Sequence, residues 1–161
     1  RKMGYFGRYA RKQNDHNDNG IDIKRGYLAE RVAAEAGIEL VRQEGAHFLA
    51  SDRLYSRVDL VMFCSLSEGL PTIALEAFAA GIPVLGTAAG IFNYIAQSGG
   101  GGVLPYDETK FVAEAVEVIH ALRENPELYR RMCAAAKAEG RKHDWSVVRP
   151  AWIEYLQSLE K

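Results

Sequence analysis

Residues 64–90 read CSLSEGLPTIALEAFAAGIPVLGTAAG, and this stretch decides the fold class. An apolar strand ends where it begins, a polar turn follows, and a helix starts near Pro71 and stops at Gly81 before a second apolar strand. The first N–H groups of a helix have no partner inside the helix, so a turn of this kind favours a bound anion. Glu68 and Glu76 lie on either side of the helix start, where carboxylates can accept hydrogen bonds from hydroxyl groups. The pattern suits a ligand that carries both phosphates and sugars.

The composition is that of one ordinary globular domain. The chain has 161 residues, of which 48% are hydrophobic and 25% charged, and we expect a single domain over residues 1–161. Its net charge of −1 provides no strong field for nucleic acid or an anionic membrane, so no nucleic-acid partner is expected. Cys64 and Cys133 lie far apart, which indicates neither a disulfide framework nor a zinc site and fits a reducing compartment.

The uncharged run at 77–96 raises the question of a membrane span, and the first residues raise the question of whether the chain is part of a longer protein. Residues 77–96 are uncharged, but three glycines and one proline interrupt them, so we interpret the run as a helix end plus a buried strand. The first residue, Arg1, leads almost at once into an apparent strand, which suggests a domain excised from a longer protein.

Strands alternate with helical patterns along the chain. Apolar runs predict strands at 3–7, 38–41, 59–64, 83–87 and 103–104. Helices are predicted at 24–36, 52–57, 93–97, 107–123, 127–142 and 147–159. The glycine run at 99–102 is expected to be a loop. This order predicts an α/β fold with a doubly wound, mostly parallel, Rossmann-like sheet, helices on both faces and additional C-terminal helices.

In such sheets ligands bind beyond the carboxyl ends of the strands, near the point where the strand order reverses. The loop after the first strand contains three cations, Arg8, Arg11 and Lys12. The loop after the strand at 59–64 leads into the helix start, where Thr72 and its neighbours offer N–H groups and a hydroxyl. Together the two loops would hold a diphosphate and stabilise the charge that builds on it as a leaving group.

The two acids also admit a purely structural interpretation, as a cap-region acid and an exposed helix acid, which helix starts favour. Glu76, however, is surrounded in sequence by apolar residues, and an acid in so apolar a helix needs a partner or a ligand.

The stretch from Glu68 to Thr87 resembles the E-x7-E signature of retaining glycosyltransferases of family 4, which have the GT-B architecture of two facing Rossmann-like domains. Residues 4–8 are similar to the family's first strand and phosphate-binding Arg. Residues 52–65 and 143–146 are similar to the helix and strand before the signature and to the turn before the last helix.

The resemblance implies catalytic roles for Arg8, Lys12 and Glu68, with the cations on the donor diphosphate and Glu68 against the donor sugar. Glu76 would bind the ribose. The donor-binding residues implied in this way are Gly7, Arg8, Arg11, Lys12, Glu68, Gly69, Leu70, Pro71, Thr72, Ile73 and Glu76. Neither a metal nor any other cofactor is expected besides the nucleoside diphosphate sugar, because the cations and the helix start do a metal's work.

The chain departs from the family pattern in three places. Gln13 stands where the family usually has a lysine, so Lys12 or Arg11 is the nearest substitute. Residues 89–93 read AGIFN where the family often carries a Glu. The segment before the signature is short, as if one strand–helix pair were missing or compressed.

The resemblance implies the C-terminal, donor-binding domain of a cytoplasmic enzyme of polysaccharide biosynthesis type, which moves a hexose from a nucleoside diphosphate sugar to a glycan, lipid or other acceptor. The acceptor would bind an N-terminal domain absent from this chain, so the isolated domain should be inactive. Peripheral association of the full-length enzyme with the inner face of a membrane stays open. The alternatives are a nucleotide-sugar epimerase of the same architecture and a non-catalytic interaction domain that retains the fold.

Other residues receive simpler interpretations. Trp145 and Trp152 are expected to anchor the terminal helix by packing, and His120 to lie on a helix surface. His47 is placed in a loop that faces the predicted site. Cys64 is expected to be a small buried residue without a catalytic role.

Overall fold

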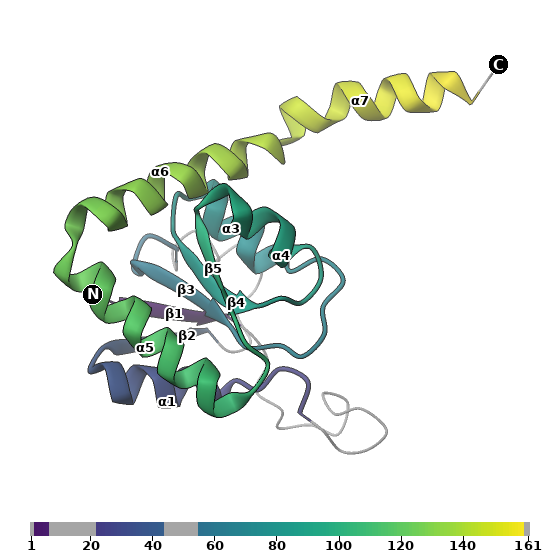
Figure 1. Cartoon of the computed structure of the whole chain (residues 1–161). Coiled ribbons are helices and arrows are strands. Elements are labelled where there is room, and N and C mark those ends of the chain that lie inside the picture. The colour runs from purple at the N-terminus through teal and green to yellow at the C-terminus, as the bar shows by residue number, and fades with distance from the viewer. Residues whose placement is uncertain (1, 7–21, 44–54, 160–161) are drawn as a thin grey trace.

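The computed structural model of the chain describes residues 2–6, 22–43 and 55–159 (Figure 1). The strands are β1 (Lys2–Phe6), β2 (Glu39–Gln43), β3 (Leu60–Phe63), β4 (Val84–Thr87) and β5 (Gly101–Leu104). The helices are α1 (Tyr27–Ala36), α3 (Thr72–Ala79), α4 (Phe92–Ile95), the 3-10 turn η3 (Ala96–Ser98), α5 (Glu108–Glu124), α6 (Pro126–Lys142) and α7 (Trp145–Ser158).

The five strands form one sheet in the order β2-β1-β3-β4-β5, and every pair is parallel. The predicted parallel α/β fold is therefore confirmed. The chain leaves β1 toward one edge of the sheet and continues from β3 toward the other. The reversal lies between β1 and β3, so the turn that follows β3 is at the place where this class of fold binds ligands.

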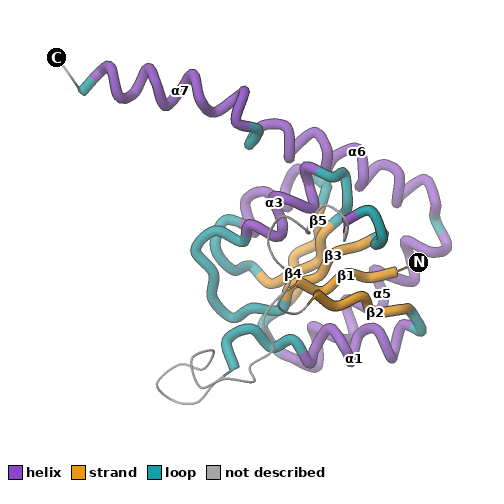
Figure 2. The backbone as a smooth tube through the Cα atoms, turned by 180° about the vertical axis from the view of Figure 1, so that it is seen from behind, coloured by secondary structure: helices purple, strands orange, loops and turns teal. Residues whose placement is uncertain are grey.

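The alternation of side chains along the buried strands divides the core into two layers. In β3, Leu60 and Met62 face the layer of α1 and α5, whereas Val61 and Phe63 face the layer of α3 and α4. Figures 1 and 2 show these two groups of helices on opposite faces of the sheet. All four residues of β3 are buried, which is why the sequence there is apolar without interruption.

Helix α1 begins three residues later than the sequence pattern predicts. The Asp22 carboxylate accepts hydrogen bonds from the N–H groups of Lys24 and Arg25, at 2.9 and 3.0 Å, and this forms a turn ahead of the helix. Arg25 has a φ of 47°, a left-handed conformation that a helix interior does not allow. Lys24 and Arg25 therefore lie near the carboxyl end of β3 instead of on a helix face.

The sequence suggested that the glycine run at 99–102 is a loop. This is wrong in part, because Gly101 and Gly102 belong to β5. A Cβ atom on Gly101 would lie 2.9 Å from the carbonyl oxygen of Val84, and one on Gly102 would lie 2.7 Å from Leu85. The two glycines let β5 approach β4 closely.

Helix α7 contradicts the expected packing of the tryptophans. Trp145 and Trp152 are 65% and 56% exposed, and none of the residues Trp145–Ser158 is buried. Figures 1 and 2 show α7 continuing away from the body beyond the end of α6. The side chains fail to anchor the helix because no other element of the described chain lies along it.

His120 and Cys64 are as expected, the first exposed on α5 and the second fully buried. None of the helices in the described part of the chain combines the length and the apolar character needed to span a bilayer.

Candidate functional site

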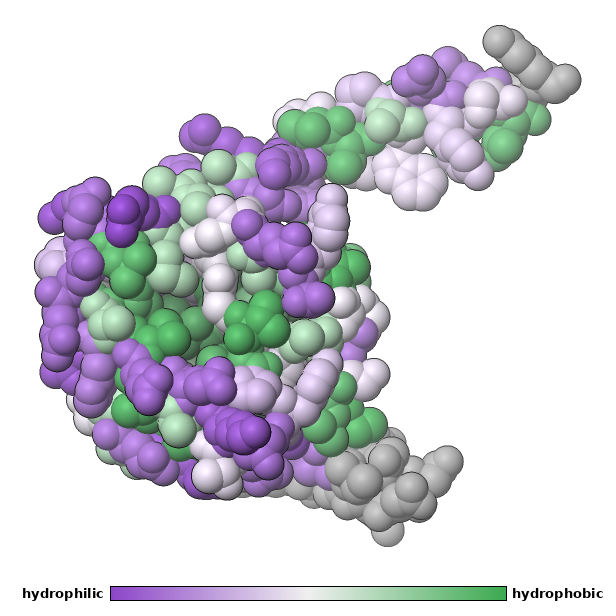
Figure 3. Space-filling model, viewed as in Figure 1, coloured by the Kyte–Doolittle hydropathy of each residue, from purple (hydrophilic) through white to green (hydrophobic). Residues whose placement is uncertain are grey.

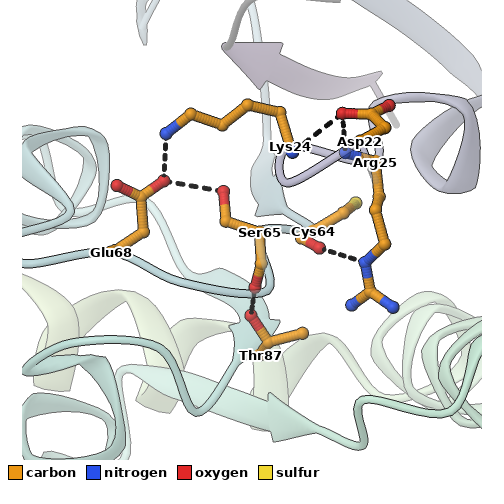
Figure 4. A network of polar contacts seen from close by, with 7 residues as sticks. All are labelled: Asp22, Lys24, Arg25, Cys64, Ser65, Glu68 and Thr87. Atoms are coloured by element: carbon orange, nitrogen blue, oxygen red, sulfur yellow. Dashed lines mark hydrogen bonds and ion pairs between the residues drawn. The ribbon is translucent and has the colours of Figure 1, made fainter. Parts of the chain in front are cut away.

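The candidate site is the turn between β3 and α3, together with the segment that precedes α1 (Figure 4). The N–H of Leu66 in the turn donates to the carbonyl of Ile23 at 2.8 Å, so the two segments lie side by side. The turn therefore brings Glu68 next to Lys24, a cation that the sequence pattern had placed inside a helix.

Glu68 is held by two donors on one carboxylate oxygen. Its Oε1 accepts from Lys24 Nζ at 2.5 Å and from Ser65 Oγ at 2.6 Å. The Glu68 and Lys24 side chains are 20% and 34% exposed, which leaves both accessible from solvent. A charge-assisted contact between two partly buried groups fixes the carboxylate in one orientation more firmly than a fully exposed ion pair would.

The turn is supported from below by the end of β4 and the loop after it. The buried hydroxyl of Thr87 donates to the carbonyl of Ser65. Gly90 has a φ of 58°, and a Cβ atom there would lie 2.3 Å from the carbonyl oxygen of Gly69. Only glycine fits so close to the turn in this conformation. The loop at 89–93 thus supports the Glu68 turn, although the family's acid is replaced there by the exposed Asn93.

Arg25 connects three elements at the carboxyl end of β3. Its side chain is buried, at 3% exposed, and Nε donates to the carbonyl of Cys64 at 2.9 Å while Nη1 donates to that of Tyr106 at 2.7 Å. No partner for Nη2 is found in the described part of the chain. The guanidinium therefore links the start of α1, the end of β3 and the segment before α5.

Cys64 lies next to this guanidinium but is not a reactive thiol. Burial raises its pKa to about 12, although the nearby Arg25 charge acts in the opposite direction. A thiol that stays protonated is a poor nucleophile, in agreement with the structural role expected from the sequence.

Helix α3 begins with unused donors. Pro71 is the N-cap residue and supplies no side-chain cap. Within the described chain, the N–H groups of Leu70, Thr72 and Ile73 have no hydrogen-bond partner, and the first closing bond runs from Ala74 N–H to the Pro71 carbonyl at 2.9 Å. These three groups are the donors that the sequence analysis assigned to an anion.

Glu76 lies one turn into α3 and is exposed. Its Oε2 accepts from the hydroxyl of Tyr55 at 2.7 Å. Burial, and to a smaller extent the Glu76 carboxylate, raise the pKa of Tyr55 above its ordinary value, so the hydroxyl keeps its proton and remains a donor. The expected partner of an acid in this apolar helix is thus a neutral phenol.

The predicted residues Gly7, Arg8, Arg11 and Lys12, and His47, lie outside the described residues. Sequence reasoning missed Lys24, Ser65 and Tyr55 as parts of the site. For Lys24 a signal was present, because an aspartate two residues earlier commonly forms a turn with the following N–H groups. Within residues 2–6, 22–43 and 55–159, no three His, Cys, Asp or Glu side chains gather as a metal site requires.

The fold and site define a Rossmann-like domain in which a helix start with unpartnered N–H groups and two carboxylates follow the carboxyl end of a central parallel strand. The sequence profile described as "Glycosyl transferases group 1" matches residues 47–139, more than half of the 161-residue chain. The chain belongs to this family, as its resemblance to the E-x7-E enzymes predicted.

Solved structures agree on the fold. The chain is similar to the pneumococcal O-GlcNAc transferase GtfA in complex with UDP and GlcNAc, with 14% identity and a TM-score of 0.76, over 98% of this chain and 35% of that one. It is similar to Anabaena HepE in complex with UDP and glucose, with 17% identity and a TM-score of 0.74, over 98% of this chain and 48% of that one.

The C-terminal domain of a group 1 glycosyl transferase, LpcC from Francisella tularensis, is also similar, with 19% identity and a TM-score of 0.60. That match covers 86% of this chain and 83% of the solved domain, whereas the chain spans half or less of the first two structures. No curated protein matches the sequence significantly.

Proposed function

We propose that this chain binds the nucleoside diphosphate sugar donor of a retaining glycosyltransferase, and that the whole enzyme moves a hexose from that donor to an acceptor. One observation carries the proposal. Glu68 is fixed by Lys24 and Ser65 on the same turn that leads to the unpartnered N–H groups at the start of α3. A carboxylate for sugar hydroxyls and donors for phosphate therefore lie within a few residues of each other.

Lys24 supplies a cation for the donor diphosphate. Its Nζ lies 2.5 Å from Oε1 of Glu68, and an ammonium group with three N–H donors can contact phosphate oxygens as well as a carboxylate. Together with the α3 start it would stabilise the negative charge that develops as the diphosphate leaves. Arg8, Arg11 and Lys12 are proposed to complete this grip, and donor binding needs no divalent metal.

The two acids divide the rest of the donor between them. Glu68 and the turn through Thr72 contact the sugar, and Glu76 accepts from the ribose hydroxyls. The similar structures of GtfA and HepE contain UDP, which makes UDP the first nucleotide to test here. The acceptor is proposed to bind a further domain of the full-length protein, so the isolated chain binds donor without transferring sugar.

Calorimetric titration of the chain with UDP, GDP and ADP in EDTA tests the proposal. We expect measurable binding of at least one of them at millimolar concentration. Replacing Lys24 with Met should weaken that binding about tenfold, because a charge-assisted contact to phosphate is lost. Lys110→Met, an exposed lysine on α5, is the matched control and should leave the affinity unchanged.

Absence of binding by all three nucleotides would count against a donor site and favour an interaction domain that has only kept the fold. Equal affinities of the Lys24→Met and Lys110→Met variants would remove Lys24 from the site while leaving the donor function in place.

A further inference from the structure

We infer that Tyr55 is a positioning residue that orients Glu76 toward the ribose of the nucleotide. This inference rests on the proposed function, in which Glu76 binds the ribose. It adds a residue that no sequence motif marks, because Tyr55 and Glu76 are 21 positions apart in the chain.

The ring of Tyr55 is anchored in the core. It is buried in the same layer as Val58, Val61 and Ala74, so the phenol has little freedom to move. Its hydroxyl extends from this layer to Oε2 of Glu76 at 2.7 Å. A rigid donor beneath an exposed carboxylate selects one rotamer of a side chain that would otherwise sample several.

The hydrogen bond from Tyr55 leaves most acceptor positions of the Glu76 carboxylate available to a ligand. Apart from the Tyr55 contact, the described residues provide no hydrogen bond or ion pair to the side-chain carboxylate of Glu76. A carboxylate has about four acceptor positions, so one donor from Tyr55 leaves room for both hydroxyls of a vicinal diol. The phenol also brings no positive charge, unlike Lys24 at Glu68, and a diol that donates hydrogen bonds binds best to a carboxylate with its charge intact.

A merely structural contact between Tyr55 and α3 is the competing explanation. It predicts that removal of the hydroxyl affects folding stability, or affects every ligand equally. Positioning of Glu76 predicts instead a loss confined to ligands with ribose hydroxyls. The two explanations therefore differ in ligand specificity.

The experiment compares UDP with 2′,3′-dideoxy-UDP and inorganic pyrophosphate, titrated into the wild-type chain, Tyr55→Phe, Glu76→Gln and the double variant. Tyr55→Phe keeps the buried ring and removes only the hydroxyl. We expect it to weaken UDP about fivefold and to leave dideoxy-UDP and pyrophosphate unchanged, since one hydrogen bond to a charged group is lost. In the double variant the loss should be smaller than the product of the two single losses, because Tyr55 acts only through Glu76.

A wild-type chain that prefers UDP over dideoxy-UDP, paired with a Tyr55→Phe variant that keeps the same preference, overturns the role of Tyr55 and leaves the donor site intact. Equal weakening of all three ligands also overturns it, in favour of the structural explanation. A wild-type chain that binds UDP and dideoxy-UDP equally contradicts the ribose role of Glu76, and one that binds none of the nucleotides contradicts the proposed function itself.

Discussion

Helices α6 and α7 follow each other in the chain, and both carry apolar residues at helical spacing, but they are packed in opposite ways. Helix α6 lies against α3, and a Cβ atom on its Gly140 would be 2.4 Å from the backbone nitrogen of Ala79. Helix α7 buries none of its residues. Figure 3 shows α7 projecting from the body with hydrophobic residues on the side that faces the viewer.

The difference shows what an amphipathic pattern can and cannot indicate. On α7, Trp145, Val148, Trp152 and Leu156 recur three or four residues apart and share one helix face. The pattern identifies the face that favours burial, but it does not reveal whether a partner surface exists in the same domain. For α6 that surface is α3, and for α7 the described chain contains none.

The largest expected change in the free energy of unfolding is at α3, the helix against which α6 packs. Phe78 is fully buried in α3, with its ring centroid 6.5 Å from that of Phe92. Phe78→Ala should lower the free energy of unfolding by about 4 kcal/mol, from lost burial and the cavity that remains. Urea denaturation followed by far-UV circular dichroism measures this, and a loss below about 1 kcal/mol would show that this layer is loosely packed.

A smaller effect is expected where α6 gives way to α7. The buried Glu139 accepts from Lys142 at 2.6 Å and contacts a ring nitrogen of His143 at 3.3 Å. The hydrogen bond from Lys142, the largest influence, holds the pKa of this carboxyl below its ordinary value of 4.5. The ionised form therefore stabilises the fold above that value, and the contribution is lost as the pH falls through the folded-state pKa.

Glu139→Gln should consequently destabilise the chain at neutral pH, on the order of 1 kcal/mol. The difference from wild type should vanish in more acidic solution. Unfolding curves of both proteins over a pH series test this, and a difference that persists unchanged below pH 4.5 would assign the effect to packing instead of charge.

The smallest effect is expected on α7. Trp152→Ala removes a large aromatic side chain, as Phe78→Ala does, but the side chain lies in solvent and contacts Tyr155 on its own helix, with ring centroids 6.2 Å apart. The free energy of unfolding should change by less than about 0.5 kcal/mol. A loss comparable to that of Phe78→Ala would mean that α7 packs against the body in solution.

The sequence predicts the strands well because β3 and β4 are buried on both faces, and β3 reads as an uninterrupted apolar run. The prediction fails at Gly101 and Gly102, where glycine is needed because the neighbouring strand β4 lies too close for a side chain. Helix α3, with Glu76 on it and Glu68 in the turn before it, was predicted from the turn and the apolar pattern. Their partners Lys24 and Tyr55 were not, because the contacts join segments 44 and 21 residues apart, and periodicity carries no information at that distance.

The exposure of α7 has a further consequence for optical work on this protein. The chain contains two tryptophans, Trp145 and Trp152, and both lie on this helix, whereas aromatic residues of the body are phenylalanine and tyrosine. Tryptophan fluorescence therefore reports the surroundings of α7 and is insensitive to unfolding of the sheet. The same signal becomes a selective probe for anything that covers this helix, since an indole moved from water into an apolar contact emits at shorter wavelength.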